Sequence, residues 1–254
     1  MTTNVPTVLV MGIKGGVGKT ILSNNISRLL AKSKKVGIID MDLDSSNLSR
    51  VMDITETMKL NKSRKFIPVH VIDNKLKLFS MGIFTNSGPQ SYSRTGDQNR
   101  ILIQQALDNT EWGGDIDLFL LDQPAGSGDE FRATIENFTN IHGAVIATQP
   151  TTSDDLYRCF DLTSRFFIPI LGVIQNMHGA VCECGCKVVC KKCNKPYFPL
   201  GTESPVEEMC TEWGVPYMGA IPMIPKLKES PIIKHPYNKP IKNIVKMILD
   251  TMEE

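Results

Sequence analysis

Residues 12–20 (GIKGGVGKT) have the composition of a phosphate-binding loop. They follow the apolar run 8–11 and precede apolar residues at helical spacing from Ile21 onward. The glycines allow backbone N–H groups to close around phosphate oxygens, and the positive end of the helix dipole favours an anion. The amine of Lys19 can reach the β- and γ-phosphates, and the hydroxyl of Thr20 can ligate Mg²⁺. This segment therefore predicts a nucleotide site.

The residues that we expect to contact the nucleotide extend from the loop into the first turn of the helix. The strict pattern G-x-x-x-x-G-K-[ST] has glycine where this chain has Ile13, but the strand, turn and helix context is the one that a phosphate loop requires. The expected contacts are Lys14, Gly15, Gly16, Val17, Gly18, Lys19, Thr20 and Ile21.

Two further apolar runs end in a carboxylate. Residues 35–40 end in Asp40, with Asp42 two positions later, and residues 116–122 end in Asp122. An apolar strand that ends in aspartate is the arrangement in which the carboxylate holds a Mg²⁺-bound water. Parallel sheets present the carboxyl ends of their strands to ligand. We therefore expect Asp122 to hold Mg²⁺ through water, with Asp40 and Asp42 at the same edge of the sheet.

Apolar runs alternate with helical patterns along the whole chain. With 254 residues, 41% of them hydrophobic, the chain is large enough to bury a full core. The alternation predicts an α/β fold with a mostly parallel, doubly wound sheet and helices on both faces. Because no internal repeat or linker is visible, we expect a single P-loop ATPase domain over residues 1–254. Residues 178–200 form a cysteine-rich insert within it.

Charge and hydropathy indicate the cellular location of the protein and the classes of partner that it is expected to lack. The formal net charge of +1 predicts no attraction to nucleic acid or to anionic lipid. The first residues lack the charged and apolar regions of a secretion signal, and the longest apolar runs are too short to span a membrane. We therefore expect a cytoplasmic protein that binds neither nucleic acid nor membranes.

Five of the seven cysteines are crowded into twelve residues, which favours metal ligation over disulfides. One interpretation is an iron–sulfur cluster, and another is a tetrahedral Zn²⁺ held within one chain by C-x-x-C at 190–193 and two upstream cysteines. Nickel, copper or redox chemistry remain further alternatives. Cys159 and Cys210 lie on helical patterns and are expected in the core. The candidate ligands are Cys182, Cys184, Cys186, Cys190 and Cys193.

The loop KGGVGKT at residues 14–20 resembles the deviant Walker A loop of the MinD/ParA, nitrogenase iron protein and Mrp-type ATPases. In those families the first lysine reaches across a dimer interface to the nucleotide of the partner. The resemblance thus implies an ATP-dependent homodimer, in which Lys14 stabilises charge on a phosphoryl group held by the other subunit and Lys19 acts on its own nucleotide.

Within that class, four later segments resemble the Mrp/ApbC-type iron–sulfur carriers. Residues 40–46 correspond to a D-x-D element, 123–129 (QPAGSGD) to the glycine-rich switch after the Mg²⁺ aspartate, 170–177 (ILGVIQNM) to the L-G-V-V-E-N-M strand, and 215–222 (VPYMGAIP) to V-P-x-L-G-x-I-P. The resemblance implies roles for single residues. Asp42 would orient the attacking water, Asp40 would support Mg²⁺ through its outer shell, Asn176 would read the adenine, and Pro222 would flank it.

The resemblance also implies a cargo. In the carriers, C-x-x-C-G begins six residues after the asparagine of the N-M strand, and two subunits share one [4Fe–4S] cluster. Counting from Asn176 reaches Cys182, but here the pair is C-x-C and three more cysteines follow. The implied function is slow ATP hydrolysis coupled to cluster transfer to client apoproteins. The alternatives are a MinD/ParA-like positioning ATPase with a structural zinc knuckle, and an ATP-dependent metal-insertion or electron-transfer protein.

Overall fold

The strand that leads into the glycine-rich loop lies inside the sheet. In the computed structural model, β1 (Thr7–Met11) pairs in parallel with β7 (Leu118–Asp122) on one side and with β8 (Ile141–Thr148) on the other. All five residues of β1 are buried. An apolar run without alternation is typical of a parallel strand that is covered on both faces. The structure describes residues 4–42, 46–80, 83, 104, 109–126, 128–201, 205–227 and 229–253.

The main sheet has the strand order β10-β9-β8-β1-β7-β2-β6-β5. Its pairs are parallel except for β5 and β6, which are antiparallel at one edge. The separate strands β3 (Lys59–Leu60) and β4 (Phe66–Ile67) form a small antiparallel hairpin. The remaining strands of the main sheet are β2 (Val36–Asp40), β5 (Val69–Ile72), β6 (Leu76–Phe79), β9 (Ile170–Ala180) and β10 (Tyr217–Met223).

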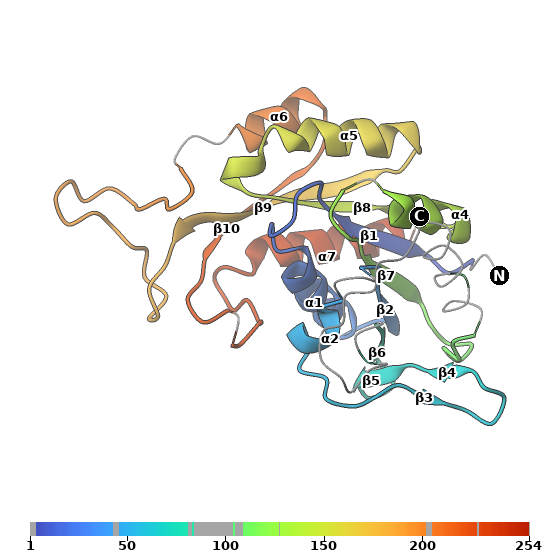
Figure 1. Ribbon diagram of the computed structural model, residues 1–254. Helices are drawn as coiled ribbons and strands as arrows, with labels where there is room; N and C mark the ends of the chain where they lie inside the picture. Colours follow the sequence, from blue (N-terminus) through green and yellow to red (C-terminus); the bar gives the residue numbers. More distant parts are fainter. Residues whose placement is uncertain are drawn as a thin grey trace.

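Helices cover both faces of this sheet (Figure 1). One face carries α1 (Lys19–Leu30), α2 (Leu48–Val51) and α7 (Lys239–Thr251). The other carries α4 (Asp129–Asn137), α5 (Asp155–Arg165) and α6 (Val206–Glu212), with the short 3₁₀ helix η2 (Pro150–Thr152) before α5. The predicted doubly wound, mostly parallel fold with a cysteine-rich insert is confirmed. Among the described residues, no helix is long and apolar enough to cross a membrane.

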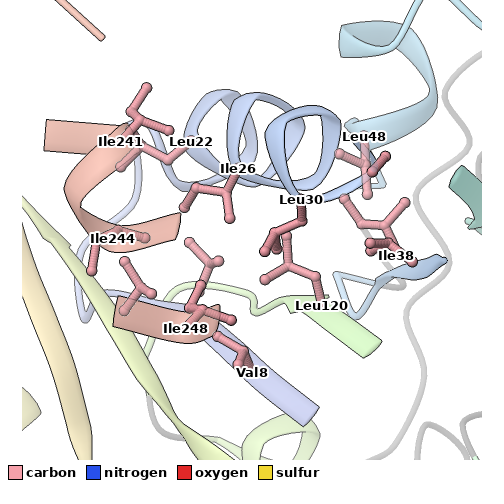
Figure 2. Packing of buried hydrophobic residues seen from close by; sticks show 14 of the residues in the cluster. Val8, Leu22, Ile26, Leu30, Ile38, Leu48, Leu120, Ile241, Ile244 and Ile248 are labelled. Atoms are coloured by element: carbon pink, nitrogen blue, oxygen red, sulfur yellow. The ribbon is translucent and has the colours of Figure 1, made fainter. Parts of the chain in front are cut away.

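The core between α1, α7 and the sheet is built from side chains at helical spacing. Leu22, Ile26 and Leu30 recur every four residues along α1 and are fully buried. Figure 2 shows them packed toward strand residues, including Val8 and Leu120, and toward the isoleucines of α7. This packing fixes the helix that begins at the glycine-rich loop against the strand that precedes the loop.

The insert begins later than its expected boundary at residue 178. Strand β9 continues to Ala180, which lies beside Met223 of β10. Residues 178–180 therefore belong to the strand, because a neighbouring strand is present to receive their backbone hydrogen bonds. The sequence had no signal for this extension, since the pairing partner lies more than forty positions away.

We predict that Ile26→Ala lowers the free energy of unfolding by about 2–5 kcal/mol, because it leaves a cavity in a fully buried site. Urea unfolding measures the change. Leu60→Ala serves as the control, since the side chain of Leu60 is exposed and its loss should change the stability by less than about 0.5 kcal/mol. Equal effects of the two substitutions would contradict this account of the core.

Candidate functional site

The glycine-rich loop has the backbone geometry of a turn between β1 and α1. Gly16 and Gly18 have φ angles of 79° and 92°, which side-chain-bearing residues rarely adopt. A Cβ on Gly12 would lie 2.6 Å from the carbonyl oxygen of Ala147 on β8, so the close approach of the two strands also requires glycine there. Around Gly15, by contrast, no atom of the described residues lies within 4 Å of an added Cβ. The open side of the loop is therefore where a ligand can approach.

Asn176 holds this loop from β9, two strands away from β1. Its side chain is buried, and its Nδ2 donates a hydrogen bond of 2.9 Å to the carbonyl of Val17. A Cβ on Gly18 would lie only 2.2 Å from that Nδ2. Ile221 on β10 is the register partner of Asn176, so Pro222 lies next to it in the adjacent strand. The structure thus brings Asn176 to the loop and places Pro222 on the strand beside it, and the contact of either residue with adenine stays a prediction.

The two loop lysines have different environments. Lys19 is 9% exposed, and its Nζ donates to the carbonyl of Lys14 at 3.2 Å. Burial lowers the pKa of Lys19, while the negative charges of Asp122 and Asp42 oppose that shift. The side chain of Lys14 is 54% exposed and lies 3.8 Å from a carboxylate oxygen of Asp155 at the start of α5. Lys19 therefore points into the loop, whereas Lys14 remains at the surface.

Asp122 lies at the buried end of β7, under the first turn of α1. Ser23 donates a hydrogen bond of 2.8 Å to its Oδ1, and Thr20 also bonds to this carboxylate. Burial, followed by repulsion from Asp40, raises the pKa of Asp122 to about 7, and the hydrogen bonds and Lys19 oppose the rise. The Thr20 hydroxyl and the buried Asp122 carboxylate are suitable ligands for Mg²⁺, which prefers oxygen ligands. A bound Mg²⁺ would favour the ionised form of Asp122.

Asp40 is the register partner of Asp122 in the neighbouring strand β2. Its carboxylate accepts hydrogen bonds from Ser46 at 2.6 Å, from Ser80 at 3.0 Å and from the backbone of Leu48 at 3.1 Å. Burial raises its pKa to about 6 in spite of these bonds. The two predicted strand-end carboxylates therefore adjoin each other, as the parallel register requires.

Of the other expected nucleotide residues, Asp42 adjoins this pair, and Val17 and Ile21 lie in the loop and the first turn of α1. The half-buried Asp42 donates its backbone N–H to Asp40 Oδ1 at 3.2 Å, and its charge acts on Lys19. Val17 is buried beneath the loop, and Ile21 packs against the core from the first turn of α1. The placement of water by Asp42 stays a prediction. Leu43, Asp44, Ser45 and Ser127, within the two segments compared with the D-x-D and switch elements, lie outside the described residues.

The structure brings together three of the five crowded cysteines. The ligand atoms of Cys182, Cys184 and Cys186 all lie within 4.8 Å of one another, with 2.8 Å between the sulfurs of Cys182 and Cys184. A turn shapes this group, which we term the cysteine cup, because the N–H of Cys182 donates to the carbonyl of Cys186 at 2.9 Å. Thiols so close to one another are suited to a thiophilic metal or an iron–sulfur cluster.

The other two cysteines of the insert, Cys190 and Cys193, do not join this cup. Backbone N–H groups of Cys193 and Lys192 donate to the sulfur of Cys190 and lower its pKa. Among the described residues, no other three metal-ligating side chains have their ligand atoms as close together as those of the cup. The structure therefore does not group Cys190 and Cys193 with the cup, and the four-cysteine zinc site that was one interpretation of the sequence stays a prediction. Cys159 and Cys210 are buried, as expected.

Comparison with known families decides the class of protein. A model described as "ParA: NUBPL iron-transfer P-loop NTPase" matches residues 4–252. The chain belongs to this family. The resemblance to deviant Walker A ATPases of the iron–sulfur branch is confirmed at that level.

Relatives agree with this assignment, and solved structures agree with the fold. The chain is 31% identical over 226 residues to the "Cytosolic Fe-S cluster assembly factor NUBP2 homolog" of Nematostella vectensis, covering 87% of this chain and 80% of that protein. With NUBP2 of Gallus gallus it shares 29% identity over 88% of this chain and 80% of that protein. An Archaeoglobus fulgidus nucleotide-binding protein in complex with ADP has the same fold, with a TM-score of 0.68, 21% identity, and coverage of 94% and 87%. For Pyrococcus horikoshii MinD complexed with Mg-ADP the TM-score is 0.58, with 20% identity and coverage of 97% and 95%.

In this member of the NUBPL family the cysteine cup is bonded to the segment that follows β10, of which the structure describes residues 224–227 and 229–237. The hydroxyl of Tyr237 donates to the carbonyl of Gly185, within the cup's turn. Lys226 forms an ion pair of 3.1 Å with Glu183. The N–H of Val181 adds a hydrogen bond of 3.2 Å to the carbonyl of Met223, just before the segment. The cup therefore has an anchorage outside its own hairpin.

The same segment is bonded to α1. Asn24 and Asn25 donate to the carbonyl of Pro231 at 3.0 and 2.9 Å, and Asn25 accepts from the N–H of Ile233 at 2.8 Å. Sequence reasoning missed Asn24, Asn25 and Tyr237. The available signal was weak. It consisted of two adjacent amides among the apolar positions of the helix after the loop, where buried amides require partners.

We predict that Asp122→Asn changes how stability depends on pH in the nucleotide-free, Mg²⁺-free protein. The folded state, with an Asp122 pKa of about 7, binds this proton more tightly than the unfolded chain, whose aspartates titrate at about pH 4. The wild type therefore loses this part of its stability as the pH rises from about 4 to about 7. The asparagine variant should gain stability relative to the wild type over that range, measured by urea unfolding.

The control is Asp250→Asn, on the exposed side of α7. Its difference from the wild type should stay constant between pH 5 and pH 8. A constant difference for Asp122→Asn as well would show that the buried carboxylate is not protonated in the folded protein.

Proposed function

We propose that this chain is a homodimeric, slowly hydrolysing ATPase that carries an iron–sulfur cluster and passes it to client apoproteins. The observation that carries the proposal is a structural connection between two sites. The segment after β10 contacts the cysteine cup through Lys226 and Tyr237, and between these two residues Pro231 and Ile233 bond to α1, the helix that begins at the glycine-rich loop. Through this segment a change in the position of α1 would be passed on to the cup.

The names of the relatives support the cargo and its location. The homologues of Nematostella vectensis and Gallus gallus are both named as cytosolic Fe-S cluster assembly factors. We extend that role to this chain, with a cytoplasmic location and apo iron–sulfur proteins as clients. We further propose that the whole chain is one P-loop ATPase domain, since one sheet takes its strands from residues 7 to 223.

The nucleotide half of the function follows from the loop and the strand ends. Residues 15–20 and Ile21 would surround the phosphates, with Lys19 donating to the β- and γ-phosphate oxygens. Thr20 would ligate Mg²⁺ directly and Asp122 through water, while Asp40 supports that shell. When bound, Mg²⁺ neutralises charge on the phosphates. Asn176 and Pro222 would contact the base.

The residues that would act in hydrolysis come from two subunits. Asp42 orients the water that attacks the γ-phosphorus as the bond to the leaving ADP oxygen breaks. The exposed amine of Lys14 is free to leave Asp155 and place its charge on the phosphoryl group of the partner's nucleotide. Hydrolysis would therefore require dimer closure, which links nucleotide state to the arrangement of the two cups.

The cysteine cup would bind the cargo through three thiolates. A [4Fe–4S] cluster has four irons that need ligands, so a cup of three leaves one position for a partner subunit or a client thiolate. Such an incomplete ligand set suits a cluster that must be released. Zn²⁺ would instead be expected to recruit a fourth ligand and remain as a structural ion.

The test of the cargo is anaerobic purification followed by metal and sulfide analysis and a visible spectrum, before and after iron and sulfide are supplied. We expect iron and acid-labile sulfide in near-equal amounts and a broad charge-transfer band. Cys182→Ser combined with Cys184→Ser should abolish both, whereas Cys210→Ser, which alters a buried core cysteine, should preserve them. One zinc per chain and a colourless protein would contradict the proposal and favour a structural knuckle on a positioning-type ATPase.

A second prediction distinguishes the role of Lys14 from that of Lys19. Lys19→Ala should prevent nucleotide binding in calorimetric titration. Lys14→Ala should still bind ATP as a monomer but lose ATP-dependent dimerisation in size-exclusion chromatography, and its hydrolysis should fall at least about 100-fold. Lys32→Ala, at an exposed position just after α1, is the control for loss of a lysine. Hydrolysis by Lys14→Ala at the wild-type rate would rule out the action of this lysine across a dimer.

A further inference from the structure

The insert consists of two hairpins that share a middle segment. In the first, the N–H of Val188 donates to the carbonyl of Ala180, and Val181 pairs with Lys187. In the second, the N–H of Tyr197 donates to the carbonyl of Val188, and residues 189 and 196 pair. We term residues 188–197 the tip hairpin. Figure 1 shows the chain beyond β9 running into two loops that extend in different directions.

This arrangement places the two cysteine groups at opposite ends of the shared segment. The cup lies in the turn before Lys187, and the turn of the tip hairpin begins at Cys190, whose N–H donates to the carbonyl of Lys195 at 2.8 Å. Three residue steps of extended chain span about 10 Å. Thiolates on one zinc ion are about 4 Å apart, given Zn–S bonds of about 2.3 Å. Cys190 and Cys193 therefore stand apart from the cup.

The tip hairpin has a strong local charge. No aspartate or glutamate occurs between positions 187 and 201, although the whole chain has 28 basic and 27 acidic residues. Val189 and Tyr197 are 43% and 54% exposed, which adds apolar area beside the charge. The basic side chains of the hairpin, all at exposed positions, are those of Lys191, Lys192 and Lys195, and the exposed Lys187 lies just before it.

We propose that the tip hairpin is the docking site for the client apoprotein, through an acidic client surface, and that Cys190 and Cys193 shape this tip rather than ligate the cluster. The proposal rests on the carrier function proposed above. Two copies of the chain cannot pair tip to tip, because this contact would bring lysines of like charge together. An empty cluster site lined with thiolates is anionic, and complementary charge accelerates encounter.

The separate roles of the cup in cluster binding and of the tip hairpin in client binding agree with the different contacts that hold them. The cup is bonded to the segment after β10, within reach of the ATPase, by Tyr237 and Lys226. The tip turn is held by bonds within its own hairpin, including those to the sulfur of Cys190. A client bound at the tip would lie about 10 Å from the cup, near enough for its thiolates to reach the cluster.

The experiment uses the full-length reconstituted protein and an acidic apoferredoxin that offers four cysteine thiolates. The triple variant Lys191→Glu, Lys192→Glu, Lys195→Glu should keep the wild-type iron content and spectrum but transfer the cluster at least about tenfold more slowly at low salt. The difference should vanish at high salt, which screens exposed charges. The matched control is Lys62→Glu, Lys242→Glu, Lys246→Glu, at exposed positions elsewhere, which should transfer normally.

A second variant tests the cysteines. Cys190→Ser with Cys193→Ser should retain the cluster that Cys182→Ser with Cys184→Ser loses. Loss of the cluster from the Cys190/Cys193 variant would overturn the separation of the two groups. Transfer by the lysine variant at the wild-type rate would overturn the docking site, as would binding of single-stranded DNA by the tip in preference to apoferredoxin.

A failure of the carrier function itself is recognised separately. If the wild-type protein takes up no cluster, calorimetric titration of apoferredoxin into the iron-free protein still tests the tip. Binding that the lysine variant loses and the charge control keeps supports the docking surface. Equal binding, or none, by the three proteins overturns it.

Discussion

The burial of two adjacent carboxylates is the constraint on which the nucleotide site depends. Asp40 and Asp122 end neighbouring parallel strands in register, and burial raises the pKa of both. Such a pair is costly unless hydrogen bonds or a cation compensate it. Serine and threonine hydroxyls supply part of that compensation, and the first turn of α1 lies where it must to provide it. The position of α1 is therefore tied to the state of charge at the strand ends.

Helix α1 connects this electrostatic site with the rest of the molecule. Its apolar side packs Leu22, Ile26 and Leu30 against the sheet and α7. Its buried amides, Asn24 and Asn25, bond to the segment after β10 instead. One short helix thus contacts the phosphate loop, the carboxylate pair, the core and the anchorage of the cysteine cup. Packed side chains and hydrogen bonds of this kind are the contacts through which coupling between two sites can be carried.

The insert divides the metal chemistry from the basic surface. The cup and the tip hairpin share one segment but end in different directions, so each is free to meet a different neighbour. In the carrier proposed here, the cup responds to the nucleotide state of the ATPase, and the tip hairpin binds the client. Strand β9 also connects the two sites. It brings Asn176 to the loop, and the first cysteine of the cup, Cys182, follows Asn176 by six residues.

The sequence by itself determined the phosphate loop, the fold class and the family, because these depend on local signals. Residues 12–20 require a glycine-rich turn between strand and helix, and strands ending in Asp40 and Asp122 can meet only at one edge of a parallel sheet. The grouping of the cysteines was not determined in this way. Five cysteines within twelve residues allow several ligand sets, and the hairpin pairings select three of them.

The tertiary structure alone decided the contacts between distant segments. Asn176 on the carbonyl of Val17, Asn25 on Pro231, and Tyr237 on the turn at Gly185 each join residues far apart in the chain. No periodicity or motif marks such pairs, since a buried amide or hydroxyl requires a partner but does not specify which one. Chain packing makes that choice, and with it the connection between the nucleotide loop and the cysteine cup.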